Sequence, residues 1–132
     1  LLTDVAVHPS LPMALLIDRL ASRNNHYLCH VAVWDCDNPR IIPLPVPGVN
    51  EAGKYYSDMQ FSPDGNWAVF RDDTDDDRSP QFLALAIDAE RETFVGEQRS
   101  LGACPGVSST CWSTAPQSFV ACNGSALYRW RL

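Results

Sequence analysis

Lysine is almost absent from this sequence, which has one, Lys54, and nine arginines scattered along the chain. The 10 basic residues stand against 16 acidic ones, so the formal net charge is −6 at pH 7. Proteins that bind nucleic acid neutralise phosphates with clustered Lys and Arg side chains. The composition therefore argues against a nucleic-acid partner.

Long apolar runs and helical periodicity are also missing. No run of 18 or more apolar residues occurs, so we expect no membrane insertion. No window sustains the 3.6-residue apolar period of an amphipathic helix, which argues against an α/β fold. The best helical candidate, Leu11–Ala21, contains Pro12, so we keep only a short helix there as an alternative to a strand.

The common motifs of catalysis are missing as well. The sequence has no Gly-rich phosphate loop, and Gly106-Val107-Ser108-Ser109 lacks the closing glycine of a nucleophile elbow. We therefore expect no catalytic residues and predict that the chain is not an enzyme.

Five cysteines occur, an odd number, and none of them forms a Cys-x-x-Cys pair. That spacing supports neither a zinc ribbon nor a thioredoxin-type site. We expect most of them to be small buried residues on strands, Cys111 among them. If the protein is exported, Cys104 and Cys122 are the pair that we expect to form a disulfide.

An acidic run is the most conspicuous polar feature. Five carboxylates within six residues offer hard oxygen ligands of the kind that calcium prefers. The run lacks the central Gly and terminal Glu of an EF-hand, so a solvated charged loop is the favoured interpretation and a weak calcium site the alternative. No other cofactor is expected. The candidate ligands are Asp72, Asp73, Asp75, Asp76 and Asp77.

The three histidines do not indicate a metal site. His26 and His30 are four residues apart, which places two side chains on one face only in a helix, and His30 begins an expected strand.

One stretch of the sequence predicts a strand, a tight turn and a second strand. Proline sets φ, aspartate can bond the backbone ahead of it, and glycine accepts a positive φ. We expect Phe61, Val69 and Leu85 to be buried and the turn at Asp64 and Gly65 to be exposed. The motif residues are Phe61, Ser62, Pro63, Asp64, Gly65 and Trp67.

This stretch resembles the Phe-Ser-Pro-Asp-Gly element of WD40-like, TolB-type β-propellers. Degenerate copies of it lie at residues 7–16 and 112–121. The resemblance implies an all-β fold, a partial β-propeller of about three four-stranded antiparallel blades, the last one incomplete. A β-sandwich is the alternative.

The repeats divide residues 1–132, a single β-repeat domain, into units of about 1–50, 51–103 and 104–132. The chain begins with Leu1 rather than Met, so we expect it to be a fragment of a longer protein. The expected strands are Asp4–His8, Met13–Arg19, Leu28–Asp35, Arg40–Val46, Tyr56–Ser62, Asn66–Asp72, Gln81–Asp88, Glu92–Arg99, Ser108–Ser113, Gln117–Cys122 and Ala126–Arg131.

The four tryptophans lie at expected strand positions, where large apolar side chains pack blade against blade. For Trp130 a role at a binding surface stays open, because its neighbours Arg129 and Arg131 indicate a solvent-exposed face.

The repeats supply surface and no chemistry, so we expect a binding or interaction module for a protein partner or a small ligand. Two alternatives stay open: the non-catalytic propeller of a peptidase-like enzyme, and an extracytoplasmic sensor domain. An incomplete arc of blades would expose apolar faces, so we also expect self-association or missing blades. The resemblance weakly favours a periplasmic or other extracytoplasmic location.

Overall fold

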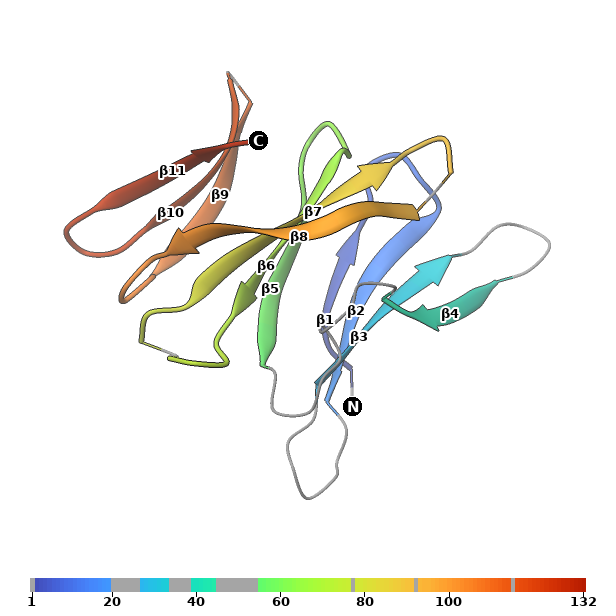
Figure 1. The fold of residues 1–132 in the computed structure, drawn as a ribbon, viewed down its shortest axis with the longest axis horizontal. Helices are drawn as coiled ribbons and strands as arrows, with labels where there is room; N and C mark the ends of the chain where they lie inside the picture. Colours follow the sequence, from blue (N-terminus) through green and yellow to red (C-terminus); the bar gives the residue numbers. More distant parts are fainter. Residues whose placement is uncertain are drawn as a thin grey trace.

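The computed structural model describes residues 2–19, 27–33, 39–44, 55–76, 78–91, 93–114 and 116–132. In these ranges every regular element is a β-strand, and the strands form three antiparallel sheets that lie side by side in chain order (Figure 1). The strands are β1 (Leu2–Val7), β2 (Met13–Arg19), β3 (Tyr27–Val33), β4 (Arg40–Pro43), β5 (Tyr56–Phe61), β6 (Trp67–Asp72), β7 (Gln81–Asp88), β8 (Thr93–Ala103), β9 (Ser109–Thr114), β10 (Gln117–Cys122) and β11 (Leu127–Arg131).

We call the sheets blade 1 (β1–β4), blade 2 (β5–β8) and blade 3 (β9–β11). Each is a meander in which every strand pairs with the next one along the chain. Blades 1 and 2 have four strands, whereas blade 3 has three in the part of the chain that the structure describes. The predicted all-β fold, a partial β-propeller with an incomplete last blade, is confirmed. None of the described elements is a helix long and apolar enough to cross a membrane.

Blade 2 is buried on both faces because its strands are apolar at successive positions. In β6, Ala68 and Phe70 belong to the core between blades 1 and 2, whereas Val69 belongs to the core between blades 2 and 3. Neighbouring residues of a strand point to opposite faces, so a continuous apolar run fills two cores at once. The run Trp67–Phe70 therefore fixes the middle blade between its neighbours.

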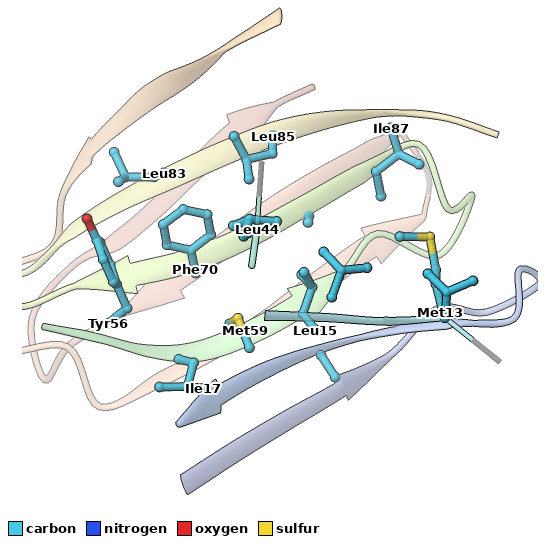
Figure 2. Packing of buried hydrophobic residues seen from close by; sticks show 14 residues of the cluster. Met13, Leu15, Ile17, Leu44, Tyr56, Met59, Phe70, Leu83, Leu85 and Ile87 are labelled. Carbon is cyan, nitrogen blue, oxygen red and sulfur yellow. The ribbon is translucent and has the colours of Figure 1, made fainter. Parts of the chain in front are cut away.

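The larger core lies between blades 1 and 2 (Figure 2). β2 contributes Met13, Leu15 and Ile17, and Phe70 from β6 stands across from them, with the ring of Tyr56 5.3 Å away at a right angle. Edge-to-face contacts of this kind add to the stabilisation from burial. The remaining members are Ala6, Val31, Val33, Leu44, Met59, Ala68, Leu83, Leu85 and Ile87.

The smaller core lies between blades 2 and 3 and is mainly aromatic. The rings of Phe82 and Phe119 are 5.2 Å apart, and Trp130 stacks on Phe119 at 6.0 Å. Cys104 and Ala121 are fully buried in the same cluster. The predicted role of the tryptophans in packing blade against blade fits Trp67, Trp112 and Trp130, which all pack against this cluster.

The first strands of blades 1 and 2, β1 and β5, each contain an irregularity in their pairing register with the next strand. In β5 the irregularity contains Asp58, whose φ of 50° lies in the left-handed region that aspartate tolerates better than most residues. Asp4 of β1 accepts a hydrogen bond from the Met59 backbone N–H at 3.1 Å. The irregular segment of β5 is therefore tied to blade 1.

The strand bounds differ from the predicted ones mainly at the outer strands. β2, β7 and β10 have the predicted bounds, whereas β8 runs to Ala103, beyond the predicted end at Arg99. Gly102, with a φ of 139°, continues β8 alongside β7, where Phe82 pairs with it. The predicted ends of the third and fourth strands, at Asp35 and Val46, lie outside the described residues.

Two burial predictions were wrong. Gly65 is buried rather than exposed, because the ring of His8 from blade 1 lies over it. Cys111 is exposed rather than buried, because it lies on the outer face of blade 3, away from blade 2. Phe61 is partly buried, and Val69 and Leu85 are buried as predicted.

Candidate functional site

The motif stretch closes the hairpin between β5 and β6. The Ser62 N–H donates to the Trp67 carbonyl at 2.8 Å, and the Gly65 N–H donates to the Ser62 carbonyl at 2.9 Å. The Ser62 hydroxyl donates to Asp64 at 2.6 Å and accepts from the Trp67 N–H at 3.0 Å. Since Ser62 has no exposed surface, its hydroxyl supports the turn and does not meet solvent.

Asp64 joins this turn to the hairpin turn of blade 3. Its carboxylate accepts a hydrogen bond from the Gln117 side-chain amide at 2.9 Å, and Gln117 accepts one from the Asp64 N–H at 3.2 Å. Partial burial raises the pKa of Asp64, but hydrogen bonds from Ser62, Asn66 and Gln117 outweigh it. The pKa therefore lies below its ordinary value of 3.8, and the carboxylate is ionised at neutral pH.

His8 joins the same turn to blade 1. Its Nδ1 accepts hydrogen bonds from the backbone N–H groups of Ser10, at 3.1 Å, and Leu11, at 2.9 Å. An Nδ1 that accepts carries no proton, so Nε2 carries it and donates to the Gly65 carbonyl at 2.8 Å. The imidazole also meets the Phe61 ring edge to face at 4.9 Å.

These contacts connect the first hairpin turns of all three blades. We call them the turn belt: the β1–β2, β5–β6 and β9–β10 turns, linked through His8, Gly65, Asp64 and Gln117. These links cannot be predicted from local sequence patterns, because each joins residues that are far apart in the chain. The motif residues are thus structural and hold the rim of the blades together.

The acidic run lies at the other end of β6, in the loop that leads to β7. Two of its four described carboxylates bond within the loop: Asp72 accepts from the Thr74 N–H and Asp76 from the Arg78 N–H, both at 2.9 Å. Asp73 pairs with the Arg71 guanidinium at 2.6 Å and accepts from the Ser57 hydroxyl at 3.1 Å. Such contacts are typical of aspartates that cap turns.

The loop encloses a hollow of about 210 Å³. Asp75 and Asp76 on its rim are exposed, and Asp75 forms no hydrogen bond or ion pair with another described residue. The hollow is open to a cationic or hydrogen-bonding group of modest size. Its lining residues are Asp72, Asp75, Asp76, Ser79 and Gln81.

The described residues place no group of three His, Cys, Asp or Glu side chains where they could hold a metal ion. Asp77, the fifth predicted ligand, lies outside the described residues, as does His26. Calcium binding by the acidic run therefore stays a prediction.

The expected disulfide between Cys104 and Cys122 is not formed; both are free thiols, as is Cys111. Cys104 packs with Phe119 and Ala121 in the core between blades 2 and 3, whereas Cys122 follows Ala121 and points to the opposite face of β10. Burial, and then the charge of Cys122, raise the pKa of the Cys104 thiol above its ordinary value. Cys36 and the Cys29 side chain are not described.

Trp130 is a packing residue. Its ring stacks on Tyr128 at 6.1 Å and lies 5.8 Å from Phe82. Its indole also stands over Gly102 of β8, where a Cβ would meet Nε1 at 3.5 Å. The solvent-exposed face that was predicted around Trp130 is therefore formed by its neighbours Arg129 and Arg131, which are both exposed.

No protein-family model matches the sequence. No curated protein matches it either. Among solved structures, the chain is similar to the β-propeller domain of the Trilobed protease from Pyrococcus furiosus, a domain described as having an open velcro topology. The match has a TM-score of 0.50 and 14% identity and covers 92% of this chain and 34% of the other. The chain thus spans about a third of the matched one, and the likeness shows a β-propeller fold.

Proposed function

We propose that this chain is a non-catalytic β-propeller-type binding module, with WD40-like, TolB-type repeats, that holds a protein partner at the ends of its blades. One observation carries the proposal: blade 2 is buried on both faces, so the turns and loops at both ends of its strands have a fixed frame. Loops held by a rigid scaffold are where binding residues usually lie.

The acidic loop is the part of this frame best suited to a partner. Its hollow is lined by three aspartates, and the net charge of −6 favours the approach of cationic groups. A Lys or Arg side chain of a partner protein matches both the size and the charge of the hollow. The proposed contact is therefore a basic side chain inserted among Asp72, Asp75 and Asp76.

The experiment is an NMR titration of the chain with a basic pentapeptide, Gly-Arg-Gly-Arg-Gly. We expect amide shifts in the loop around Asp75 and Ser79, and loss of those shifts in Asp75→Asn. The matched control is Glu90→Gln, which removes one charge from an exposed turn at the opposite end of β7. If the two variants bind the peptide equally well, the acidic loop is not the binding site.

A second candidate function is supported by the similarity to a protease propeller. In this alternative the chain is the non-catalytic propeller of a peptidase-like enzyme. A full-length reading frame that also encodes a Gly-x-Ser-x-Gly nucleophile elbow would favour this alternative. A transmembrane helix in the same frame would favour the third alternative, an extracytoplasmic sensor.

Self-association through blade 1 is a further proposal about partners. The outer face of this blade, opposite the core, exposes Val5 (47%), Val7 (61%) and Ile41 (66%). Val5 and Val7 lie on β1 and Ile41 on β4, at the two edges of the sheet, and exposed apolar side chains that share one face are typical of an interaction surface. Two copies joined through these faces would bury them around a two-fold axis.

A further inference from the structure

His8 is a buried titratable side chain that the proposed binding function does not use. It follows β1 at the start of the turn to β2, and only 4% of its surface is exposed. The other buried polar residues that the structure describes are Ser62 and Ser118. Histidine is the side chain whose ordinary charge change falls between pH 5 and pH 8. His8 is therefore the member of this set that can gain a charge near neutral pH.

Both ring nitrogens of His8 are engaged, and their roles are opposite. Nδ1 accepts hydrogen bonds from the N–H groups of Ser10, at 3.1 Å, and Leu11, at 2.9 Å. Nε2 donates to the Gly65 carbonyl at 2.8 Å. A neutral imidazole has one donor nitrogen and one acceptor nitrogen. The three hydrogen bonds are therefore complete only for the neutral ring with its proton on Nε2.

A second proton on the ring is incompatible with this arrangement. It must bind to Nδ1, because Nε2 already carries a proton. The new Nδ1–H would point at the N–H groups of Ser10 and Leu11, so two hydrogen bonds are lost and donors face one another. The ring and the β1–β2 turn must then move apart. The bond from Nε2 to Gly65 depends on the present position of the ring and is lost with it.

No described carboxylate forms an ion pair with His8 that would compensate for its charge. Asp4 of β1 accepts two backbone N–H groups, and Asp58 of β5 pairs with Arg71 at 3.7 Å. Asp64 of the β5–β6 turn is bound within that turn and to blade 3. A buried charge without a paired counter-ion is costly. The charged residues of β2 and β6 lie at the ends of these strands that are far from His8: Asp18, Arg19, Arg71 and Asp72.

The link from the same turn to blade 3 does not share this sensitivity. Asp64 accepts a hydrogen bond from the Gln117 side chain at 2.9 Å, and an amide does not titrate. Hydrogen bonds hold the pKa of Asp64 below its ordinary value of 3.8, so its carboxylate stays ionised between pH 5 and pH 8. The β5–β6 turn thus has one link that depends on a neutral imidazole and one that is stable in mild acid.

We propose that His8 is a pH-sensitive link between blades 1 and 2: when its ring takes up a proton, the β5–β6 turn separates from blade 1 and stays bound to blade 3. The two states are the closed turn belt with a neutral ring and an open one with a charged ring. Because the contact requires the neutral ring, it is complete near pH 8 and is lost as the pH falls towards 5. This inference goes beyond the binding function and does not involve the acidic loop.

The test is an NMR titration of the chain between pH 8 and pH 5. Ring 15N shifts give the tautomer and the charge of His8, and amide exchange gives the protection factors of Ser10 and Leu11. We expect a neutral ring with its proton on Nε2 at pH 8 and a charged ring at pH 5. The two protection factors should fall roughly tenfold over this range, because each amide loses one neutral hydrogen bond.

The amide of Asn66 is the internal control for local opening. It donates to the Asp64 carboxylate at 3.0 Å, in the same turn as Gly65 but on the side that is linked to blade 3. Its protection factor should stay unchanged between pH 8 and pH 5. An equal loss of protection at Asn66 and at Ser10 would mean that the turns unfold together, which would overturn the selective release from blade 1.

Two variants separate His8 from other groups that titrate. His8→Asn retains an oxygen that can accept from Ser10 and Leu11 but gains no charge, so the protection of these amides should not change with pH. His30→Asn, at a half-buried position in β3, should respond to pH as the unmodified chain does. A pH response that persists in His8→Asn, or disappears in His30→Asn, would overturn the proposal.

The unmodified chain decides the question by itself if His8→Asn does not fold. A ring that is still neutral at pH 5 would overturn the proposal, and so would a charged ring beside Ser10 and Leu11 amides that keep their protection. The proposed function is tested by the separate peptide titration of the acidic loop, so failure of one proposal leaves the other standing.

Discussion

The imidazole of His8 in blade 1 lies over Gly65 in blade 2 and donates a hydrogen bond to its carbonyl at 2.8 Å. A Cβ added to Gly65 would meet the His8 ring at 2.6 Å, and the φ of Gly65 is +76°. The contact thus requires glycine for two separate reasons, and each can be measured.

Gly65→Ala should lower the free energy of unfolding by about 1–3 kcal/mol, because strain at positive φ and the clash with His8 both act. Two control variants separate the effect of strain at positive φ from the effect of the clash with His8. Gly106→Ala has a positive φ of 62° but open space, and Gly124→Ala has open space and no positive φ. Urea denaturation should rank the losses as Gly65, then Gly106, then Gly124, and a smaller loss at Gly65 than at Gly106 would contradict the clash.

Asp64→Asn should destabilise the fold at neutral pH and do so less in acid. The pKa of Asp64 is lowered by folding, so the ionised carboxylate contributes stability above the unfolded value of about 3.8. That contribution is lost as the pH falls through the lower folded pKa. Denaturation curves of both proteins between pH 2 and pH 7 should therefore converge at low pH, whereas a constant difference would exclude a role for the charge.

Val69→Ala and Val120→Ala compare equivalent positions in β6 and β10. Val69 is fully buried between blades 2 and 3, so its truncation should cost about 2 kcal/mol. Val120 lies on the partly exposed outer face of blade 3, and its truncation should cost less than about 1 kcal/mol. Equal losses in urea denaturation would show that the outer face of blade 3 is covered.

The three described thiols should react with a thiol reagent in the order of their exposure. The thiolate is the reactive form, and burial raises the pKa of Cys104 as well as shielding it. In the native protein Cys111, which is exposed, should be modified first and Cys104 only on unfolding. Mass spectrometry of timed samples gives the order, with Cys111→Ser as the control for the fast phase; a fast Cys104 would mean that blades 2 and 3 separate readily.

Val7→Lys should prevent self-association if blade 1 joins two copies. A dimer would have twice the 14.6 kDa of the chain in light scattering. The substitution places a charge in the exposed apolar face without touching the core, so the fold should persist. Leu127→Lys, at a 69% exposed position on blade 3, is the matched control and should leave the dimer intact.

The sequence was informative wherever the structure depends on neighbouring residues. The turn from Ser62 to Trp67 was predicted because proline, aspartate and glycine each have a local backbone preference. The bounds of β2 and β7 were predicted because each strand contains a continuous apolar run, Met13–Ile17 in β2 and Phe82–Ile87 in β7, that is followed by a polar residue.

Contacts between blades could not be predicted in the same way. His8 and Gly65 are 57 positions apart, and nothing near either residue indicates the other. The burial of Gly65 was missed for that reason. The disulfide expected between Cys104 and Cys122 fails for a related reason: Cys104 packs beside Ala121 in the core between blades 2 and 3, and the next residue, Cys122, points to the opposite face of β10.

The outer faces of blades 1 and 3 also bear on how copies of such a unit can be joined. Identical units that stack end to end without closing a ring form fibres of indefinite length. In the described residues the outer face of blade 1 exposes Val5 and Val7, whereas the outer face of blade 3 exposes Arg129 and Arg131 beside Leu127. A stack in which blade 3 of one copy meets blade 1 of the next would therefore press arginines against apolar side chains, and the desolvation of the guanidinium groups disfavours that arrangement.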